Sequence, residues 1–253
     1  MGLLSIVLFR PKNDLSIYHN ADWWNPNGSF GILAKMNKIR VPYFVTYLNN
    51  VVDIIDLGCG GGLVTEEIAR HFPNRNVTGY DISEGALNQA RSHGATLVNL
   101  NYKVGSLYQI PLPENSVDGV IVSDVFEHLD DLPRALSEIH RVLKPGGILV
   151  FDTIARTWWS WLSTYIVAQE VLGVIPRGTH DWSLFINPEE LKDKLIATGF
   201  TTNRSDWKGI CGNISILNVL TTRSFTHVIE SFYEDVTDLQ ASYMGYAVKP
   251  LTT

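Results

Sequence analysis

Residues 51–62 of the chain, with the sequence VVDIIDLGCGGG, predict a short buried strand followed at once by a glycine-rich turn. An apolar run of this kind is typical of a parallel strand covered on both faces. Glycines let the backbone turn sharply and let a ligand approach it closely. Residues 63–72 then show helical spacing, and a helix that starts after such a turn offers free N–H groups to a ligand. The stretch therefore predicts a nucleotide-bearing cofactor at the carboxyl end of the first strand. The alternative is a glycine-rich turn without a ligand.

The alternation of strand and helix continues beyond this stretch. Further strands are predicted at residues 76–80, 117–123 and 148–152, and helices at 32–48, 63–72, 83–93 and 132–143. Pro42 must kink or restart the first of these helices. Ser83 is the predicted N-cap of one helix, and Asn187 is the predicted N-cap of another, with Pro188 at its first position. Regular alternation predicts an α/β fold with a mainly parallel sheet.

Composition and charge narrow the class of protein. The 253 residues carry 20 Lys and Arg against 26 Asp and Glu, a formal net charge of −6, which argues against general binding of nucleic acid. Cys59 and Cys211 are the only cysteines, so we expect no disulfide framework and a reducing, cytoplasmic compartment. The apolar run at 1–9 lacks a basic start and a small-residue cleavage site, so we expect no signal peptide. We expect an N-terminal arm with helices at 1–50 and the cofactor-binding domain at 51–253.

Two acidic residues indicate which cofactor binds. The glycines are compressed into G-x-G-G-G after Asp56, and a carboxylate there would repel a pyrophosphate but could pair with an ammonium group. Asp81 closes the second predicted strand, 21 residues after Gly60, where an acid accepts hydrogen bonds from ribose hydroxyls. Together these features favour S-adenosylmethionine (SAM) over a dinucleotide. The alternative for Asp81 is a helix N-cap or a surface turn.

Asp124, Glu127 and His128 follow the predicted strand at 117–123 and point to chemistry in the same crevice. On one helical turn these positions share a face, and such a set could hold Mg²⁺ or a transition metal. A bound metal would favour the phenolate form of a phenol. Alternatively, His128 alone acts as a general base. A third interpretation is that Glu127 and His128 only shape the pocket and bind the cofactor.

Taken together, these motifs resemble class I SAM-dependent methyltransferases: D-x-G-x-G-G-G at 56–62, an acid after the second strand, E-H, and K-P-G-G at 144–147. A closer resemblance is to the ubiquinone-biosynthesis O-methyltransferase family (UbiG type). Three groups of segments between about residues 18 and 250 carry it: WWNPNGSF at 23–30 with MNKIR at 36–40, PRGTHDW at 176–182 with FINPEEL at 185–191, and SYMGYA at 242–247. The chain departs from the family pattern at Asn25, Lys38 and Asp124, where Asp, Pro and Glu are usual.

The resemblance implies a Rossmann-like class I methyltransferase fold, with a mainly parallel seven-stranded sheet and helices on both faces. By position it implies cofactor contacts at Arg40, Gly58, Asp81 and Ser123, and a divalent cation, Mg²⁺, at Asp124, Glu127 and His128. The full predicted SAM-binding set is Arg40, Asp56, Gly58, Gly60, Asp81, Ile82, Ser106, Leu107 and Ser123. The predicted catalytic pair is Glu127 and His128. Without the family, Arg40 would be interpreted as a surface cation on a helix.

Tryptophans gather at residues 158–175, and no charge falls between Arg156 and Glu170. The resemblance implies a lid here, within an insertion at about 155–186, that covers the active site and contacts lipid. Indole rings favour the membrane interface, which makes this contact physically reasonable. The alternatives are a helix that spans the membrane, although polar residues interrupt its apolar run, and a simply buried lid helix. His180 and Asp181 either close over the substrate or only hold the loop.

The sequence therefore predicts an O-methyltransferase that moves a methyl group from SAM to a phenolic hydroxyl of a polyprenylated quinone precursor. We expect a small polyprenyl phenol as substrate, peripheral contact with the membrane from the cytoplasm, and other quinone-biosynthesis proteins as partners. Because a fold does not fix a function, three alternatives stay open. They are a SAM-dependent methyltransferase of another small phenol, acid or lipid, an NAD-dependent oxidoreductase, which the compressed glycines disfavour, and a non-catalytic SAM-binding module.

Overall fold

The computed structural model describes residues 14, 16–19, 21–28, 30–171, 175–214 and 229–251. Residues 1–9, for which we expect no signal peptide, lie outside the described residues. The strands are β1 (Asp53–Leu57), β2 (Asn76–Asp81), β3 (Leu100–Val104), β4 (Val117–Ser123), β5 (Leu143–Ile154), β6 (Lys208–Ile214), β7 (Ile229–Asp235) and β8 (Ser242–Val248). The α-helices are α2 (Ser16–His19), α3 (Gly31–Tyr47), α4 (Leu63–His71), α5 (Glu84–His93), α6 (Leu132–Val142), α7 (Trp158–Ser160) and α8 (Pro188–Ala197).

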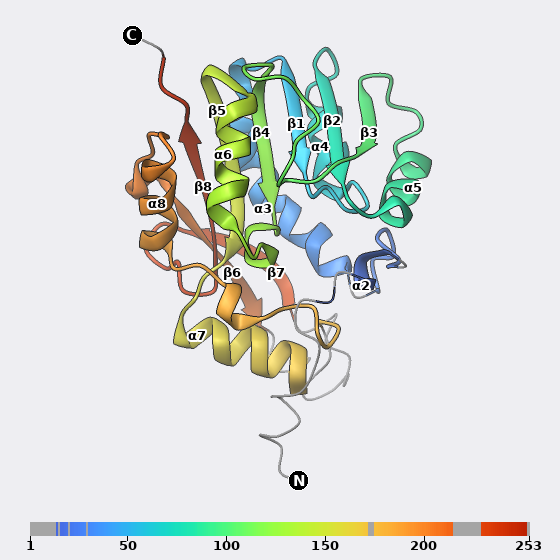
Figure 1. Cartoon of the computed structure of the whole chain (residues 1–253). Helices are drawn as coiled ribbons and strands as arrows, with labels where there is room; N and C mark the ends of the chain where they lie inside the picture. Colours follow the sequence, from blue (N-terminus) through green and yellow to red (C-terminus); the bar gives the residue numbers. More distant parts are fainter. Residues whose placement is uncertain are drawn as a thin grey trace.

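The described strands form one sheet in the order β3-β2-β1-β4-β5-β8-β6-β7 (Figure 1). The first five strands of this order are parallel, and β8, β6 and β7 are antiparallel to their neighbours. The predicted α/β class with a mainly parallel sheet is confirmed. The expected number of seven strands is wrong, because β7 pairs with the edge of β6 and makes an eighth strand.

The strand register brings the predicted site residues to one end of the sheet. The chain leaves β1 toward β2 on one side and reaches β4 on the other, so the strand order reverses between β1 and β4. Ligands in open α/β sheets bind outside the carboxyl ends of the strands at such a switch point. Ser123 at the end of β4 pairs in register with Asp152 of β5, and Asp81 ends β2. The acidic residues therefore meet at the end where β1 gives way to the glycine turn.

Helices cover both faces of the sheet, as expected. Because successive side chains of a strand point to opposite faces, neighbouring residues of β1 enter different cores. Ile54 packs in a cluster with Phe44 of α3 and Ile68 of α4. Ile55 packs in the opposite cluster with Leu136 of α6 and Leu195 of α8. The result is a three-layer arrangement in which helices pack on each face of the sheet.

Local signals in the sequence set several helix boundaries. Ser83 is the N-cap of α5, and its hydroxyl accepts a hydrogen bond from the N–H of Ala86. Asn187 is the N-cap of α8, with Pro188 at the start of the helix. Both predicted N-caps are confirmed. The expected restart at Pro42 is wrong, because α3 runs through this residue as one helix.

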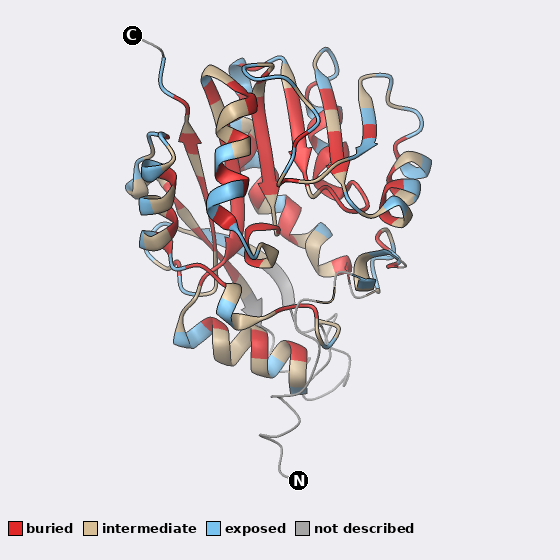
Figure 2. Cartoon of the chain, in the orientation of Figure 1, coloured by how far each residue is buried: buried red, intermediate tan, exposed pale blue. Residues whose placement is uncertain are grey.

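The tryptophan-rich segment forms a lid helix, which consists of α7 and the π-helix η3 (Trp161–Val171). It lies beyond the carboxyl ends of the parallel strands (Figure 1), and most of its residues are intermediate in burial, with a few exposed and a few buried ones among them (Figure 2). Trp158 is 69% exposed, whereas Tyr165 and Gln169 are buried. The interpretation as a simply buried helix is therefore wrong. Among the described helices, none has the length and apolar character needed to cross a bilayer.

Candidate active site

The glycine turn after β1 is bound tightly to the end of β2. The N–H groups of Gly58 and Cys59 donate to the carbonyl oxygen of Tyr80 at 2.7 and 3.0 Å. Gly58 has a φ of +76°, and a Cβ there would lie 2.5 Å from a methyl group of Val125. Only glycine avoids both the left-handed strain and this clash. The turn therefore brings bare backbone to the edge of the crevice.

Asp81 joins the glycine turn to the start of α5. One carboxylate oxygen accepts the N–H of Gly60 at 2.9 Å, and the other accepts the N–H of Ser83 at 2.7 Å. Burial raises the pKa of Asp81, and these backbone donors oppose that shift. The N-cap of α5 is Ser83, so the N-cap alternative for Asp81 is wrong. Each oxygen of an ionised carboxylate has a second lone pair, so Asp81 can still accept hydrogen bonds from a ligand.

Asp56 lies deeper than Asp81. Its side chain is almost fully buried, and its carboxylate accepts the hydroxyl of Thr65 at 2.6 Å. Burial raises the pKa of Asp56 to about 7, against the opposing effects of Thr65 and Arg40. A cationic group in the crevice would favour the ionised form of this residue. Its predicted pairing with an ammonium group stays a prediction.

Arg40 connects α3 to the carboxylates at the ends of β4 and β5. The guanidinium is 2% exposed, forms an ion pair with Asp124, and donates to Asp152 at 3.2 Å. Its Nε also donates to Asn37 at 2.7 Å. Burial alone would lower the pKa of Arg40, but the two carboxylates outweigh it and raise the pKa. The interpretation of Arg40 as a surface cation is wrong, because a buried guanidinium needs these partners.

Asp124 has a φ of +53°, in the left-handed region. Its N–H donates to the carbonyl oxygen of Asp152 at 3.2 Å, and its carboxylate pairs with Arg40. A non-glycine residue in this conformation costs about 1–3 kcal/mol and persists only where its surroundings hold it. The ion pair with Arg40 supplies that support. The carboxylate of Asp124 is thus engaged with Arg40.

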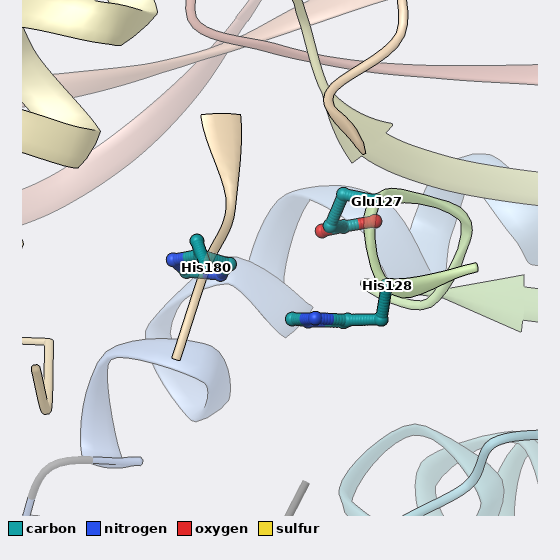
Figure 3. Close-up of side chains that lie close together, drawn as sticks. All are labelled: Glu127, His128 and His180. Atoms are coloured by element: carbon teal, nitrogen blue, oxygen red, sulfur yellow. The ribbon is translucent and has the colours of Figure 1, made fainter. Parts of the chain in front are cut away.

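A second cluster brings together Glu127, His128 and His180 (Figure 3). One potential ligand atom of each residue lies within 4.8 Å of those of the other two. The rings of His128 and His180 stack with centroids 5.2 Å apart. Glu127 and His128 come from the 3₁₀ turn η2 (Phe126–His128) after β4, whereas His180 comes from the segment that follows the lid helix. Of the three residues predicted to hold a cation, two lie in this cluster, and Asp124 is not part of it.

Burial disfavours the charged forms of these three side chains. It raises the pKa of Glu127 well above its usual range, and Asp124 adds to that shift. It lowers the pKa of His128 to about 4, although Asp124 opposes the shift. It also lowers the pKa of His180, and His128 adds to this. Neutral imidazoles are the form that binds metals or accepts protons.

The chemistry of the cluster suits a bound cation. Oε1 of Glu127 and Nδ1 of His180 are buried and lack a hydrogen-bond partner within the part of the chain that the structure describes. Native proteins rarely leave buried polar atoms unsatisfied, and an ion is one explanation for them. Carboxylate oxygen and imidazole nitrogen are ordinary metal ligands. Glu127, His128 and His180 can therefore hold a cation.

A cavity of about 900 Å³ unites the predicted residues. Ligand sites commonly have volumes of about 300–1,000 Å³, so this cavity is large enough for a cofactor and an acceptor together. The residues of the predicted SAM-binding set that line it are Arg40, Asp56, Gly58, Gly60, Asp81, Ile82, Ser106, Leu107 and Ser123, which is the whole set. Asp124, His128, His180 and the lid residues Trp159, Leu162 and Val167 also line it. Glu127 is fully buried and does not line the cavity.

Three residues that contribute to the site were not predicted from the sequence. Asp152 is fully buried and accepts the hydroxyl of Ser123 in addition to Arg40. An acid inside the apolar strand sequence ILVFDTI was the signal that could have revealed it. Tyr18 of α2 lies 3.1 Å from Nε2 of His128 through its hydroxyl, and Gln169 of the lid helix binds the backbone of His180. No local pattern marks these two contacts.

Comparisons with known proteins show which family this chain resembles. A methyltransferase domain family matches residues 55–151. The chain is 34% identical over 172 residues to a ubiquinone biosynthesis O-methyltransferase of Coxiella burnetii, covering 67% of this chain and 73% of that protein. It is 30% identical to the protein of the same name from Rickettsia bellii, covering 81% and 87%.

Solved structures support the fold. A SAM-dependent methyltransferase of Thermotoga maritima superposes with a TM-score of 0.59 at 20% identity, covering 86% of this chain and 91% of that one. Magnesium protoporphyrin IX methyltransferase of Synechocystis, solved with bound SAH, gives a TM-score of 0.57 at 19% identity, covering 86% and 84%. The predicted Rossmann-like methyltransferase fold is confirmed.

Proposed function

The chain belongs to the ubiquinone biosynthesis O-methyltransferase family, and on this basis we propose that it transfers the methyl group of SAM to a phenolic hydroxyl of a polyprenylated quinone precursor. The observation that carries the proposal is the single cavity that joins the glycine turn and Asp81 to His128 and the lid helix. A methyl donor at the first end and an acceptor at the second would meet inside one cavity. Bringing two reactants together in line supplies much of the rate in such a transfer.

The residues of the cavity divide the work by their chemistry. When bound, SAM supplies a methyl group on a positively charged sulfur. The glycine turn would receive its backbone closely, and the carboxylate of Asp81 would accept its ribose hydroxyls. Arg40 orients Asp124 and Asp152 at the edge of the crevice. These groups bind and position the cofactor, whereas the reactive methyl group belongs to the cofactor.

The acceptor hydroxyl has to lose its proton before or during transfer, and we assign this step to the side of the cavity near Glu127 and His128. Either His128 takes the proton directly, or these residues hold a cation that lowers the pKa of the phenol. The lid helix closes the same region with apolar side chains such as Leu162 and Val167. An apolar cover excludes water and suits an acceptor with an isoprenoid tail.

The test is methyl transfer from isotopically labelled SAM to a catechol that carries a short isoprenoid tail. A panel of small phenols, acids and lipids without the tail covers the alternative acceptors. We expect transfer to the tailed catechol above all other acceptors, and Asp81→Ala serves as a control in which cofactor binding is weakened. Preferred methylation of an acid or a lipid would replace this function with the alternative one, and binding of SAM without any transfer would indicate a non-catalytic module.

We extend the proposal to the membrane, from which a polyprenylated substrate has to be collected. Trp158, Trp159 and Val171 of the lid helix are 69%, 47% and 60% exposed. Exposed indoles next to an apolar cavity suit the lipid interface. We expect the wild type to sediment with phospholipid vesicles. The double variant Trp158→Ser/Trp159→Ser should lose most of this binding. Val98→Ser is the matched control, because Val98 is 98% exposed and lies outside the lid helix; equal loss in the control would refute lipid contact by the lid. Partners among other quinone-biosynthesis proteins stay a prediction.

A further inference from the structure

The cluster of Glu127, His128 and His180 differs from the cation site that the family resemblance implies. That implied site consists of Asp124, Glu127 and His128, and it would be a carboxylate-rich site for Mg²⁺. In the structure, the potential ligand atoms that gather within 4.8 Å belong to Glu127, His128 and His180. The third member is thus a histidine from another part of the chain.

Two unsatisfied atoms mark this cluster as a binding site. Oε1 of Glu127 has no hydrogen-bond partner among the described residues, and the side chain is 0% exposed. Nδ1 of His180 likewise has no hydrogen-bond partner among the described residues, and the residue is 8% exposed. The other oxygen of Glu127 accepts the hydroxyl of Thr153 at 2.7 Å, which fixes the carboxyl group. A buried polar atom without a partner is unfavourable, and a cation held by the cluster would give both atoms a partner.

Asp124 is committed elsewhere. Its carboxylate pairs with Arg40, which is itself buried and bound to Asp152. Turning Asp124 toward His128 would break this ion pair and leave the buried guanidinium of Arg40 without one of its two carboxylate partners, which is strongly unfavourable. The network therefore favours a ligand set that leaves Asp124 with Arg40.

We propose that Glu127, His128 and His180 hold a first-row transition-metal ion, and that His180 is the ligand that ties the lid to this ion. Two imidazoles and one carboxylate suit Zn²⁺, Fe²⁺ or Mn²⁺, with a position left open for a further ligand. Mg²⁺ prefers an all-oxygen set and is the weaker binder here. This inference rests on the proposed function, because the role of the metal would be to bind the acceptor. The open coordination position would face the acceptor's end of the cavity.

The lid helix holds His180 in place. The N–H of His180 donates to Oε1 of Gln169 at 2.9 Å, and Nε2 of Gln169 donates back to the carbonyl oxygen of His180 at 3.4 Å. Gln169 is 1% exposed and lies in the π-helix of the lid. π-Helical turns are frequent at functional sites. Metal binding by His180 would therefore stabilise the closed position of the lid helix.

The test measures metal binding without turnover. The full-length protein is stripped with EDTA, then titrated with Co²⁺ followed by visible absorption, and with Zn²⁺ and Mg²⁺ followed by calorimetry. We expect one equivalent of Co²⁺ or Zn²⁺ and an affinity for Zn²⁺ about a hundredfold or more above that for Mg²⁺. Glu127→Gln and His180→Gln should each weaken Zn²⁺ binding by about tenfold or more, since each removes one of three ligands.

Two controls make the assignment specific. Asp124→Asn should change Zn²⁺ affinity by less than about threefold, and His71→Gln, at an exposed histidine of α4, should leave it unchanged. Gln169→Leu keeps all three ligands but removes the contacts that hold His180, so it tests the lid connection even if His180→Gln fails to fold. We expect it to weaken Zn²⁺ binding by an intermediate factor.

The proposal is overturned if His180→Gln folds and binds Zn²⁺ like the wild type, if Asp124→Asn loses as much affinity as His180→Gln, or if Mg²⁺ binds as tightly as Zn²⁺. Its failure is distinguishable from failure of the proposed function. Wild-type protein that binds Zn²⁺ as described but methylates no phenol would refute only the function. Methylation of the tailed catechol by a protein whose Zn²⁺ affinity ignores His180 would refute only the ligand set.

Discussion

Replacing Arg40 by methionine should destabilise the protein, because two carboxylates lose their cationic partner. Methionine fills much of the space of the arginine stem but cannot pair with Asp124 or donate to Asp152. Asp152 is fully buried, and Arg40 is 2% exposed, so little solvent can replace the lost cation. Breaking a buried ion pair by removing one partner costs about 3–5 kcal/mol. That is a large part of the ~5–15 kcal/mol that stabilises a typical domain.

The loss should fall at the lower end of this range and depend on pH. Burial raises the pKa of Asp152 to about 8, and Arg40 opposes that shift. Without Arg40 the pKa rises further, so folded Arg40→Met holds more protons than the folded wild type. Stability falls with pH where the folded state binds the extra proton. We therefore expect a loss of about 3 kcal/mol at pH 7, smaller at pH 6 and larger at pH 8.5.

Urea denaturation of the wild type and Arg40→Met, followed by tryptophan fluorescence at these pH values, measures the difference. The matched control is Arg91→Met, because Arg91 pairs with Glu84 at the surface, where the two side chains are 38% and 53% exposed. Exposed ion pairs contribute about 0–1 kcal/mol, so this control should change little. A loss in Arg40→Met no larger than in the control, or one that shrinks as the pH rises, would refute the reasoning.

Three further predictions concern the cofactor end of the cavity. Asp81→Ala should weaken SAM binding by about tenfold or more, since a charged acceptor contributes about 1.5–3 kcal/mol; unaltered affinity in calorimetry would count against its ribose role. Gly58→Ala should lower the free energy of unfolding by about 1–3 kcal/mol, because φ is +76° and the new Cβ meets Val125 at 2.5 Å; a melting temperature equal to that of the wild type would contradict this. The raised pKa of Asp56, about 7, means that the folded state keeps a proton that the unfolded state loses near pH 4. Wild-type stability relative to Asp56→Asn should therefore fall as the pH rises from 4 to 7, and a rise would show that the sign is wrong.

Local patterns in the sequence were sufficient to locate four of the parallel strands and the helices beside them, but β3 and the three antiparallel strands were not located. The helices that begin at Ser83 and Asn187 carry their N-caps within a few residues, and the compressed glycines mark a turn that no other residue type could form so closely. The reach of these signals is short. The eighth strand was missed because pairing between β6 and β7 depends on which sheet edge is left open, and alternation along the chain does not reveal this.

By itself the sequence determined the fold class, the cofactor turn and the acidic residues at the strand ends, because each depends on neighbours in the chain or on one strand's position. Only the tertiary structure decided which charged and polar side chains become partners. Arg40 meets Asp124, 84 residues away, and Asp152, 112 residues away, while His180 of the lid segment joins Glu127 and His128. The physical reason is that burial removes water as a partner, so each buried polar group must find its partner among side chains that the fold brings together.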